Sequence, residues 1–450
     1  MSIDRRKFIQ SSLLTAAAVA STNVAAISSK RSSNEKLNLA FVGVGGRGRH
    51  NLKALSVLED VNIAFMCDVD SDNLSKGAEQ YSVPHAATYR DFRVMLEEEP
   101  NIDAVVISTP DHTHAVIAMA AIKKGKHVYC EKPLTHTLHE ARKLARAAKV
   151  AGVATQMGNQ GMAFEGNRLL KEWLADGAIG TVREAHVWSD RPTTKGGGPL
   201  WWAQGIERPK DTPPTPDQLD WDLWLGPAPE RPYHPAYVPK AWRGWWDFGS
   251  GGLGDMGVHN IAPVFDALQL DAPESVSGSS TPVFEETLPL ASTVKFSFPA
   301  RGSREAVDLH WYDGGLLPPR PDELEDGREL NHEDGILLVG EEGKILVTGW
   351  GGLSPRLIPE SRQKAYKRPP RSLPRSIGHY AEWVKACRDG GETASSFDFA
   401  GPLTETLAIG SICTRLGGGK LHWDSTSLSF IGNDNANTLI NPPMRSGWSL

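Results

Sequence analysis

Two side chains that can exchange protons stand four residues apart near the middle of the chain, Asp255 and His259. Residues at that spacing share one face of a helix, so both can point into the same cleft. A histidine titrates near neutral pH and can take a proton from a hydroxyl, while a neighbouring carboxylate can orient the ring. A capping Asp followed by a buried, hydrogen-bonded His would produce the same pattern.

A third proton-active group, Lys132, stands in EKP (131–133) at the end of an apolar run. A Glu beside a Lys is usually a solvated surface pair. Lys132 would, however, lie at the carboxyl end of a buried strand, where a cation could polarise or deprotonate a substrate hydroxyl. We predict Lys132, Asp255 and His259 as catalytic residues, with Asp255 orienting His259.

A glycine cluster follows the first apolar strand. Gly43, Gly45 and Gly48 form G-x-G-x-x-G between a strand and a helix, which permits a tight turn and close approach of backbone to a pyrophosphate. Asp68 follows Gly48 by twenty residues, at the end of the next strand. Although Asp after a strand is often only a turn residue, this conjunction predicts a ligand of the adenosine ribose. Its charge would repel a 2′-phosphate, which favours NAD over NADP.

The segment STPDHTH (108–114) leaves another strand for a helix at the same edge, where ligands of parallel sheets bind. A helix started by Pro, with histidines on the surface, is the alternative. The predicted cofactor-binding residues are Gly43, Val44, Gly45, Gly46, Arg47, Gly48, Asp68, Ser108, Thr109, Pro110, His112, His114, Glu131, Lys132 and Gln160.

The elements that must position these residues alternate along the first part of the chain. LNLAFVGV, VNIAFMCDV, DAVVISTP, GKHVYCEKP and AGVATQMGN read as strands separated by helices, which indicates a doubly wound parallel sheet. Further on, STVKFSFPA and GILLVGEEGKILVTG read as strands and hairpins, and 376–390 and 402–417 as helices. We therefore expect an α/β fold with two domains.

Together the motifs resemble the Gfo/Idh/MocA family of oxidoreductases, which includes glucose-fructose oxidoreductase and inositol dehydrogenase. The resemblance rests on GVGGRG (43–48), Asp68, TPDHTH (109–114), CEKPLT (130–135) and GDMGVH (254–259). It implies a Rossmann domain over 37–160 and a C-terminal α/β domain over 161–450, whose open sheet is mostly antiparallel. It also implies catalytic roles for Lys132, Asp255 and His259, a substrate held over the nicotinamide, and a homodimer or homotetramer.

The N-terminus and the composition limit where this protein acts and on what. Arg5 and Arg6, an apolar run and AVA resemble a twin-arginine export signal, so residues 1–36 are expected to be signal and linker and the protein to be periplasmic. A net charge of -6 argues against nucleic acid as a partner, and no run is long enough to span a membrane. The four cysteines have no metal-binding or disulfide pattern, so we expect no metal.

Tryptophans are concentrated before the predicted catalytic helix, eight of the fourteen in the chain. They are Trp188, Trp201, Trp202, Trp221, Trp224, Trp242, Trp245 and Trp246. Most should be core residues, but aromatic faces also stack on sugar rings. Because they are nearest the catalytic helix, Trp245 and Trp246 are predicted as substrate-binding residues with Lys132, Asp255 and His259.

The expected activity is NAD-dependent oxidation or reduction at a sugar or cyclitol hydroxyl, with the cofactor tightly bound. One alternative is an NAD-dependent glycosidase that oxidises the sugar transiently and eliminates the glycoside, as the similar glycoside hydrolase family 109 enzymes do. A second alternative is a non-catalytic sugar-binding protein on a retained Rossmann scaffold.

Overall fold

The first sheet of the protein has six parallel strands in the order β3-β2-β1-β4-β5-β6. The computed structural model describes residues 36–194 and 198–450, and the expected export signal lies outside them. The strands are β1 (Leu37–Val42), β2 (Val61–Cys67), β3 (Thr88–Tyr89), β4 (Ala104–Ile107), β5 (His127–Cys130) and β6 (Thr155–Met157). β1 pairs with β2 on one side and β4 on the other, so the strand order reverses at β1. Ligands bind at such a reversal in doubly wound sheets.

The strands of this sheet are apolar along their whole length because helices cover both faces. All four residues of β4 are buried, and so are five of the six in β1. The crossover helices are α2 (Gly46–Ser56), α3 (Ser71–Tyr81), α4 (Phe92–Glu98), α5 (Asp111–Lys123) and α6 (Leu138–Ala151). The predicted doubly wound domain is confirmed; only the two-residue β3 has no sequence signal.

The second sheet has nine strands in the order β13-β12-β11-β7-β10-β9-β8-β14-β15. They are β7 (Val182–Ser189), β8 (Ser275–Ser280), β9 (Ser292–Phe298), β10 (Val307–Tyr312), β11 (Asp334–Gly340), β12 (Gly343–Thr348), β13 (Ser354–Ile358), β14 (Gly419–Asp424) and β15 (Ser429–Phe430). β7 and β10 are parallel and the other pairs antiparallel, as expected. Every second residue of β9 is buried, so only one face lies on the core.

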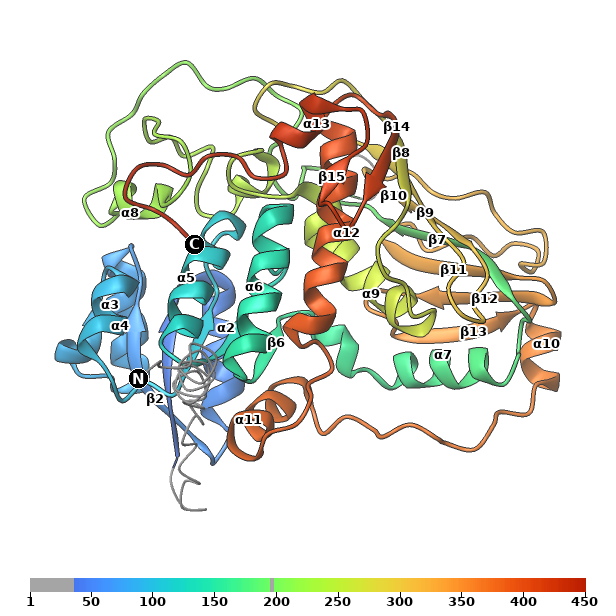
Figure 1. Ribbon diagram of the computed structural model, residues 1–450, viewed down its shortest axis with the longest axis horizontal. Helices are drawn as coiled ribbons and strands as arrows, with labels where there is room; N and C mark the ends of the chain where they lie inside the picture. Colours follow the sequence, from blue (N-terminus) through green and yellow to red (C-terminus); the bar gives the residue numbers. More distant parts are fainter. Residues whose placement is uncertain (1–35, 195–197) are drawn as a thin grey trace, which may run out of the picture. The chain divides into compact units, whose positions relative to one another are not determined.

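Helices from both halves of the chain lie between the two sheets. α7 (Glu165–Ala175) and α9 (Val258–Ala267) pack against the second sheet, and α12 (Phe397–Arg415) contacts β8, β9 and α6. Figure 1 shows α5, α6 and α12 side by side. Trp383 and Val384 of α11 (His379–Asp389) join the core beneath the first sheet. The chain therefore returns to its N-terminal half at α11 before it adds β14 and β15 to the second sheet.

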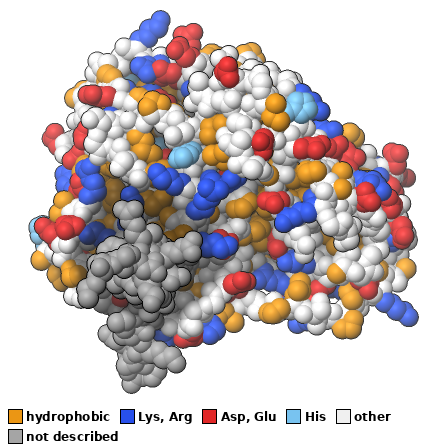
Figure 2. Space-filling view, viewed as in Figure 1, with side chains coloured by type: hydrophobic (Ala, Val, Ile, Leu, Met, Phe, Trp, Pro, Cys, Tyr) orange, Lys and Arg blue, Asp and Glu red, His pale blue; other side chains and the backbone are white. Residues whose placement is uncertain are grey.

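The remaining helices, α8 (Trp221–Leu225), α10 (Glu360–Ala365) and α13 (Asp434–Thr438), are short. Among the described residues, no helix is both long and apolar enough to cross a bilayer. Acidic and basic side chains are mixed across the described part of the face in Figure 2.

Candidate functional site

The glycine loop between β1 and α2 has a shape that only glycine permits. Gly43 has φ +81°, and a Cβ there would lie 2.8 Å from the carbonyl oxygen of Ser108. A Cβ on Gly48 would lie 2.0 Å from the carbonyl oxygen of Gly43, so α2 packs directly on the loop. No side chain caps α2, which leaves its first N–H groups available. This cradle fits the pyrophosphate of a dinucleotide.

Asp68 holds the loop in place from the end of β2. Its Oδ2 accepts hydrogen bonds from the backbone N–H groups of Val44 (2.8 Å) and Gly45 (3.3 Å). Its Oδ1 accepts one from Asp70 N (2.9 Å). Burial raises the pKa of Asp68, and these hydrogen bonds oppose the shift. Oδ1 accepts only this one hydrogen bond from the described residues, so it keeps a second acceptor position for the predicted contact with a ribose. The Val44 side chain is buried core and offers only its backbone.

Glu131 is the centre of a hydrogen-bond network at the carboxyl edge of the first sheet. Its Oε1 accepts from Arg47 Nε (2.9 Å), Asn51 Nδ2 (3.0 Å) and Gln160 Nε2 (3.4 Å). Burial would raise the pKa of Glu131, but the charge and hydrogen bond of Arg47 hold it below its usual value. The predicted residues Arg47, Glu131 and Gln160 therefore meet in one network.

Tyr380 of α11 completes this network, although it lies more than three hundred positions after Arg47 and Asn51 in the sequence. Its hydroxyl donates to Asn51 Oδ1 (2.7 Å) and accepts from Arg47 (3.2 Å). Neither Asn51 nor Tyr380 was predicted. Asn51 follows the glycine motif on α2 and could have been found by helical spacing, whereas Tyr380 carries no sequence signal.

The histidine side chains of segment 108–114 are buried against backbone carbonyls in this fold, and their predicted contact with a cofactor stays a prediction. His114 is 1% exposed, and its ring nitrogens face the carbonyl oxygens of Pro133 (2.8 Å) and Thr109 (2.9 Å). His112 is 2% exposed, and its Nε2 lies 3.0 Å from Trp224 O. Backbone carbonyls face both ring nitrogens of His114, whereas the buried Nδ1 of His112 has no hydrogen-bond partner among the described residues.

The other members of that segment remain at the edge of the sheet. Ser108 Oγ accepts from Asn51 Nδ2 (2.9 Å), and Thr109 Oγ1 accepts from Thr113 (2.8 Å). Pro110 immediately precedes α5, and its side chain forms no capping hydrogen bond with the helix. Their predicted contact with a cofactor stays a prediction.

Part of the Pro-rich stretch read as a long loop lies directly beside Asp68. Leu219 forms an antiparallel bridge with Asp70, and Asp220 N donates to Val69 O (2.9 Å). Arg90 Nη2 donates to Val69 O (2.7 Å) and Gln218 O (3.2 Å). The loop therefore borders the place where the adenosine end of a dinucleotide would bind, a role that its composition did not indicate.

Lys132 and Asp255 come together although 123 positions separate them. Lys132 Nζ donates to Asp255 Oδ1 (2.6 Å) and to its carbonyl oxygen (2.7 Å). Arg243 Nε donates to the same Oδ1 at 3.0 Å. Burial would raise the pKa of Asp255, but the two cations hold it well below its usual range. Arg243 is a site residue that the sequence did not single out.

His259 lies nearby but is not hydrogen-bonded to Asp255, which corrects the predicted orienting contact. Its Nδ1 is buried and has no hydrogen-bond partner among the described residues. The reason is local: residues Leu253–Gly257 form a π-helical turn, η5, ahead of α9. The wider turn removes the α-helical alignment of positions four apart, and Asp255 faces Lys132 instead. Burial holds the pKa of His259 well below its usual value, so the ring is neutral.

The aromatic neighbour of His259 is Trp350, not either of the predicted tryptophans. The Trp350 ring packs edge-on to His259, with centroids 5.2 Å apart. Trp245 is 0% exposed and packs on Tyr237 in the core, so it has no face for a sugar. Trp246 is 5% exposed and lines a different cavity. Proximity in sequence was misleading because the chain turns between these residues and η5.

Comparison with known proteins agrees with this architecture. Residues 37–159 match the Gfo/Idh/MocA model described as an oxidoreductase family with an NAD-binding Rossmann fold. Residues 200–282 match the model of the same family's C-terminal alpha/beta domain. The chain is 29% identical over 156 residues to the myo-inositol 2-dehydrogenase of Thermotoga maritima, covering 35% of this chain and 46% of that protein. The match therefore spans less than half of that relative.

Solved structures resemble the chain over most of its length. The WlbA dehydrogenase from Bordetella pertussis, in complex with NADH and UDP-GlcNAcA, has a TM-score of 0.60 at 17% identity, covering 87% of this chain and 99% of that one. An inositol dehydrogenase homologue from Azotobacter vinelandii, complexed with NADH and myo-inositol, has a TM-score of 0.56 at 16% identity, covering 86% and 98%. At such identities the likeness concerns the fold. The chain thus matches, in order, the models of the NAD-binding Rossmann domain and of the C-terminal α/β domain of this oxidoreductase family, over two segments.

Proposed function

We propose that this oxidoreductase is an NAD-dependent dehydrogenase acting on a hydroxyl of a sugar or cyclitol. The observation that carries the proposal is the pairing of Lys132 with Asp255 at 2.6 Å, at the edge of the sheet that also holds the glycine loop. Inositol dehydrogenases among the similar proteins support the substrate class. Bound NAD would supply a hydride acceptor next to this pair.

The proton chemistry falls to Lys132 and His259. An ammonium has three donors, and Asp255 takes two of those on Lys132, so the third can hold the oxygen of a substrate hydroxyl. The neutral ring of His259 can accept the hydroxyl proton as the hydride leaves the same carbon. Asp255 then acts as a positioning residue for Lys132, with Arg243 sharing its charge.

NAD is preferred to NADP in this proposal. The buried carboxylate of Asp68 lies against the glycine loop, where a 2′-phosphate would add a second negative charge. Arg49, a cation that could favour the phosphate, donates to Asn73 Oδ1 at 3.0 Å.

Export as a folded protein would require the cofactor to travel bound. The twin-arginine route moves folded proteins, and free NAD has no evident source outside the inner membrane. A periplasmic enzyme would therefore keep its nucleotide and return the hydride within the same site, to a second carbonyl substrate or to the same sugar.

The test is recovery of the full chain from the periplasm, followed by gel filtration and measurement of bound nicotinamide. We expect about one nucleotide per chain, and NADH absorbance on mixing with a panel of neutral sugars and inositols. Asp68→Ala should release the nucleotide, and Lys132→Met should retain it but lose turnover by about 10²- to 10⁴-fold.

Three results would reject parts of this proposal. Protein that binds no nicotinamide would exclude a dehydrogenase, and Lys132→Met with unchanged turnover would leave only a binding role. A freed sugar without net NADH would indicate the glycosidase route. Full-length protein found in the cytoplasm would remove the argument for a retained cofactor.

A further inference from the structure

A cavity of about 240 Å³ lies behind the catalytic segment, and none of the predicted catalytic residues lines it. Its wall touches that segment: Pro133 follows Lys132 in the chain, and Gly254 precedes Asp255. A Cβ on Gly254 would lie 2.1 Å from the Cβ of Ser250, another lining residue. The cavity is therefore separate from the candidate active site but shares a thin wall with it.

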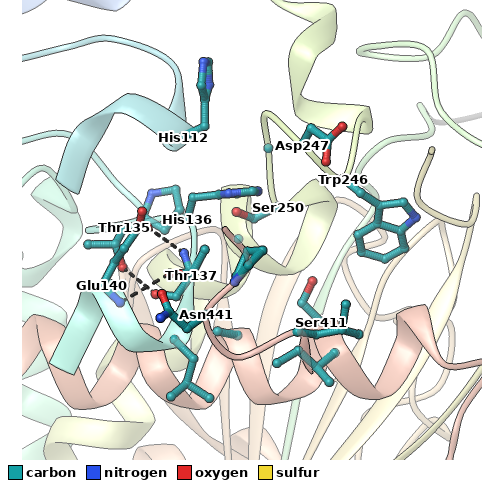
Figure 3. A pocket seen from close by; sticks show the side chains of 18 of the residues that line it. His112, Thr135, His136, Thr137, Glu140, Trp246, Asp247, Ser250, Ser411 and Asn441 are labelled. Atoms are coloured by element: carbon teal, nitrogen blue, oxygen red, sulfur yellow. Dashed lines mark hydrogen bonds between the residues drawn. The ribbon is translucent and has the colours of Figure 1, made fainter. Parts of the chain in front are cut away.

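One face of α12 supplies the polar side of this cavity. Thr404, Ala408, Ser411 and Arg415 recur at three- and four-residue spacing and all line it. In Figure 3, the Ser411 hydroxyl points from α12 into the hollow, Trp246 lies on one side, and Thr137 and Asn441 lie on the other. Neither Ser411 nor Asn441 makes a side-chain hydrogen bond with another described residue, so their polar groups are available to a ligand.

The unusual feature of this cavity is the positive charge of Arg415. Its guanidinium lies 5.2 Å from the centroid of the Trp246 ring and forms no hydrogen bond or ion pair with the described part of the chain. Burial lowers the pKa of Arg415, and the negative charge of Asp247 opposes that shift. A cation taken partly out of water without a bidentate partner is costly, and the ring offsets only part of that cost.

The acidic and imidazole groups around Arg415 are already committed. Asp247 forms an ion pair with Arg231. Glu140 accepts a hydrogen bond from Thr137 N at 2.9 Å, and burial raises its pKa to about 7. Burial lowers the pKa of His136, which keeps that ring neutral. The cavity thus contains one unpaired positive charge with hydroxyl and amide groups near it.

We propose that this cavity is a second ligand site, which binds a small carboxylate on a hydroxylated carbon skeleton. Arg415 would form the bidentate contact with the carboxylate. Ser411 and Asn441 would pair with hydroxyls, while the prolines 227, 229, 442 and 443 form rigid apolar walls. The volume is below that of pockets for drug-sized ligands, which restricts the ligand to one small molecule.

The test measures binding of D-gluconate to the full chain by calorimetry, with D-glucose, acetate and inorganic phosphate as matched probes. We expect one saturable gluconate site per chain and weaker binding of glucose and acetate, each of which lacks half of the recognised groups. Arg415→Gln should weaken gluconate binding about 10- to 100-fold. Ser411→Leu, which fills the cavity, should abolish it.

Controls separate this site from the active site and from general charge effects. Lys132→Met should bind gluconate like the wild type, and so should Lys76→Gln, which removes an exposed cation of α3. Gluconate binding lost in Lys132→Met but kept in Arg415→Gln would overturn the proposal and assign gluconate to the active site. Absence of saturable binding would also overturn it, as would phosphate binding more tightly than gluconate.

Discussion

Two buried histidines lie near Lys132, His114 in the first turn of α5 and His259 just after the turn η5, but their hydrogen-bonding environments differ. His114 of α5 has a backbone carbonyl within 2.9 Å of each ring nitrogen. His259, just after η5, has a buried Nδ1 with no partner in the described structure. Native proteins seldom leave a buried polar atom unpaired, and exceptions are found at functional sites. The difference favours a structural role for His114 and agrees with the proposed proton-accepting role of His259.

The largest effect expected from this comparison is on activity. His259→Asn should lower turnover about 10²- to 10⁴-fold, because the ring proposed to accept the proton is lost. The unfolding free energy should change little, since Nδ1 has no hydrogen bond to lose. Steady-state kinetics and chemical denaturation of the same preparation measure both quantities. A variant that loses stability but keeps turnover would reverse the assignment.

The same substitution at His114 should have the opposite outcome. His114→Asn should lower the unfolding free energy by about 2 kcal/mol, because a buried carbonyl loses its donor. Nucleotide affinity should fall as well, since the His114 ring would no longer pack between the carbonyl oxygens of Thr109 and Pro133, to one of which it donates. His50→Asn on the exposed surface of α2 is the matched control and should change neither. Denaturation curves of His114→Asn that overlay those of the control would show that the bridge is not structural.

A smaller effect, visible only in the pH dependence, concerns His112. Burial lowers its pKa to about 3, while the unfolded chain has a normal histidine. Below about pH 6.5 the unfolded state therefore binds a proton that the folded state does not, and stability falls as the pH falls. Between pH 6 and pH 5 this residue should contribute a loss of about 1 kcal/mol, which His112→Gln should lack. Parallel stability curves for the two proteins would show that His112 titrates normally in the fold.

Two arginines differ in the same way as these two histidines, because one has a hydrogen-bond partner among the described residues and the other has none. Arg243 is paired with Asp255 beside Lys132, whereas Arg415 lies over the Trp246 ring and forms no hydrogen bond or ion pair with the described residues. Both come from parts of the chain with no cofactor motif. Their roles depend on which groups the fold brings to them, and the gluconate experiment addresses the unpaired one.

The sequence by itself determined the first sheet, the glycine loop and the identity of the residues at its edge. Apolar runs with intervening helices dictate a parallel sheet, and the steric limits at Gly43 and Gly48 are local properties of the chain. The mostly antiparallel second sheet was expected from the family resemblance, and the structure confirms it.

Only the tertiary structure decided which of those residues meet. Asp255 contacts Lys132 and not His259 because η5 is a π-helical turn, a geometry that four-residue spacing does not reveal. Tyr380 and Trp350 reach the site from distant segments. Arg243 and Trp245 are both close to Asp255 in sequence, but only Arg243 contacts it, and Trp245 is buried in the core. Hydrogen bonds and burial depend on long-range packing, so local pattern names the candidates while the fold selects their partners.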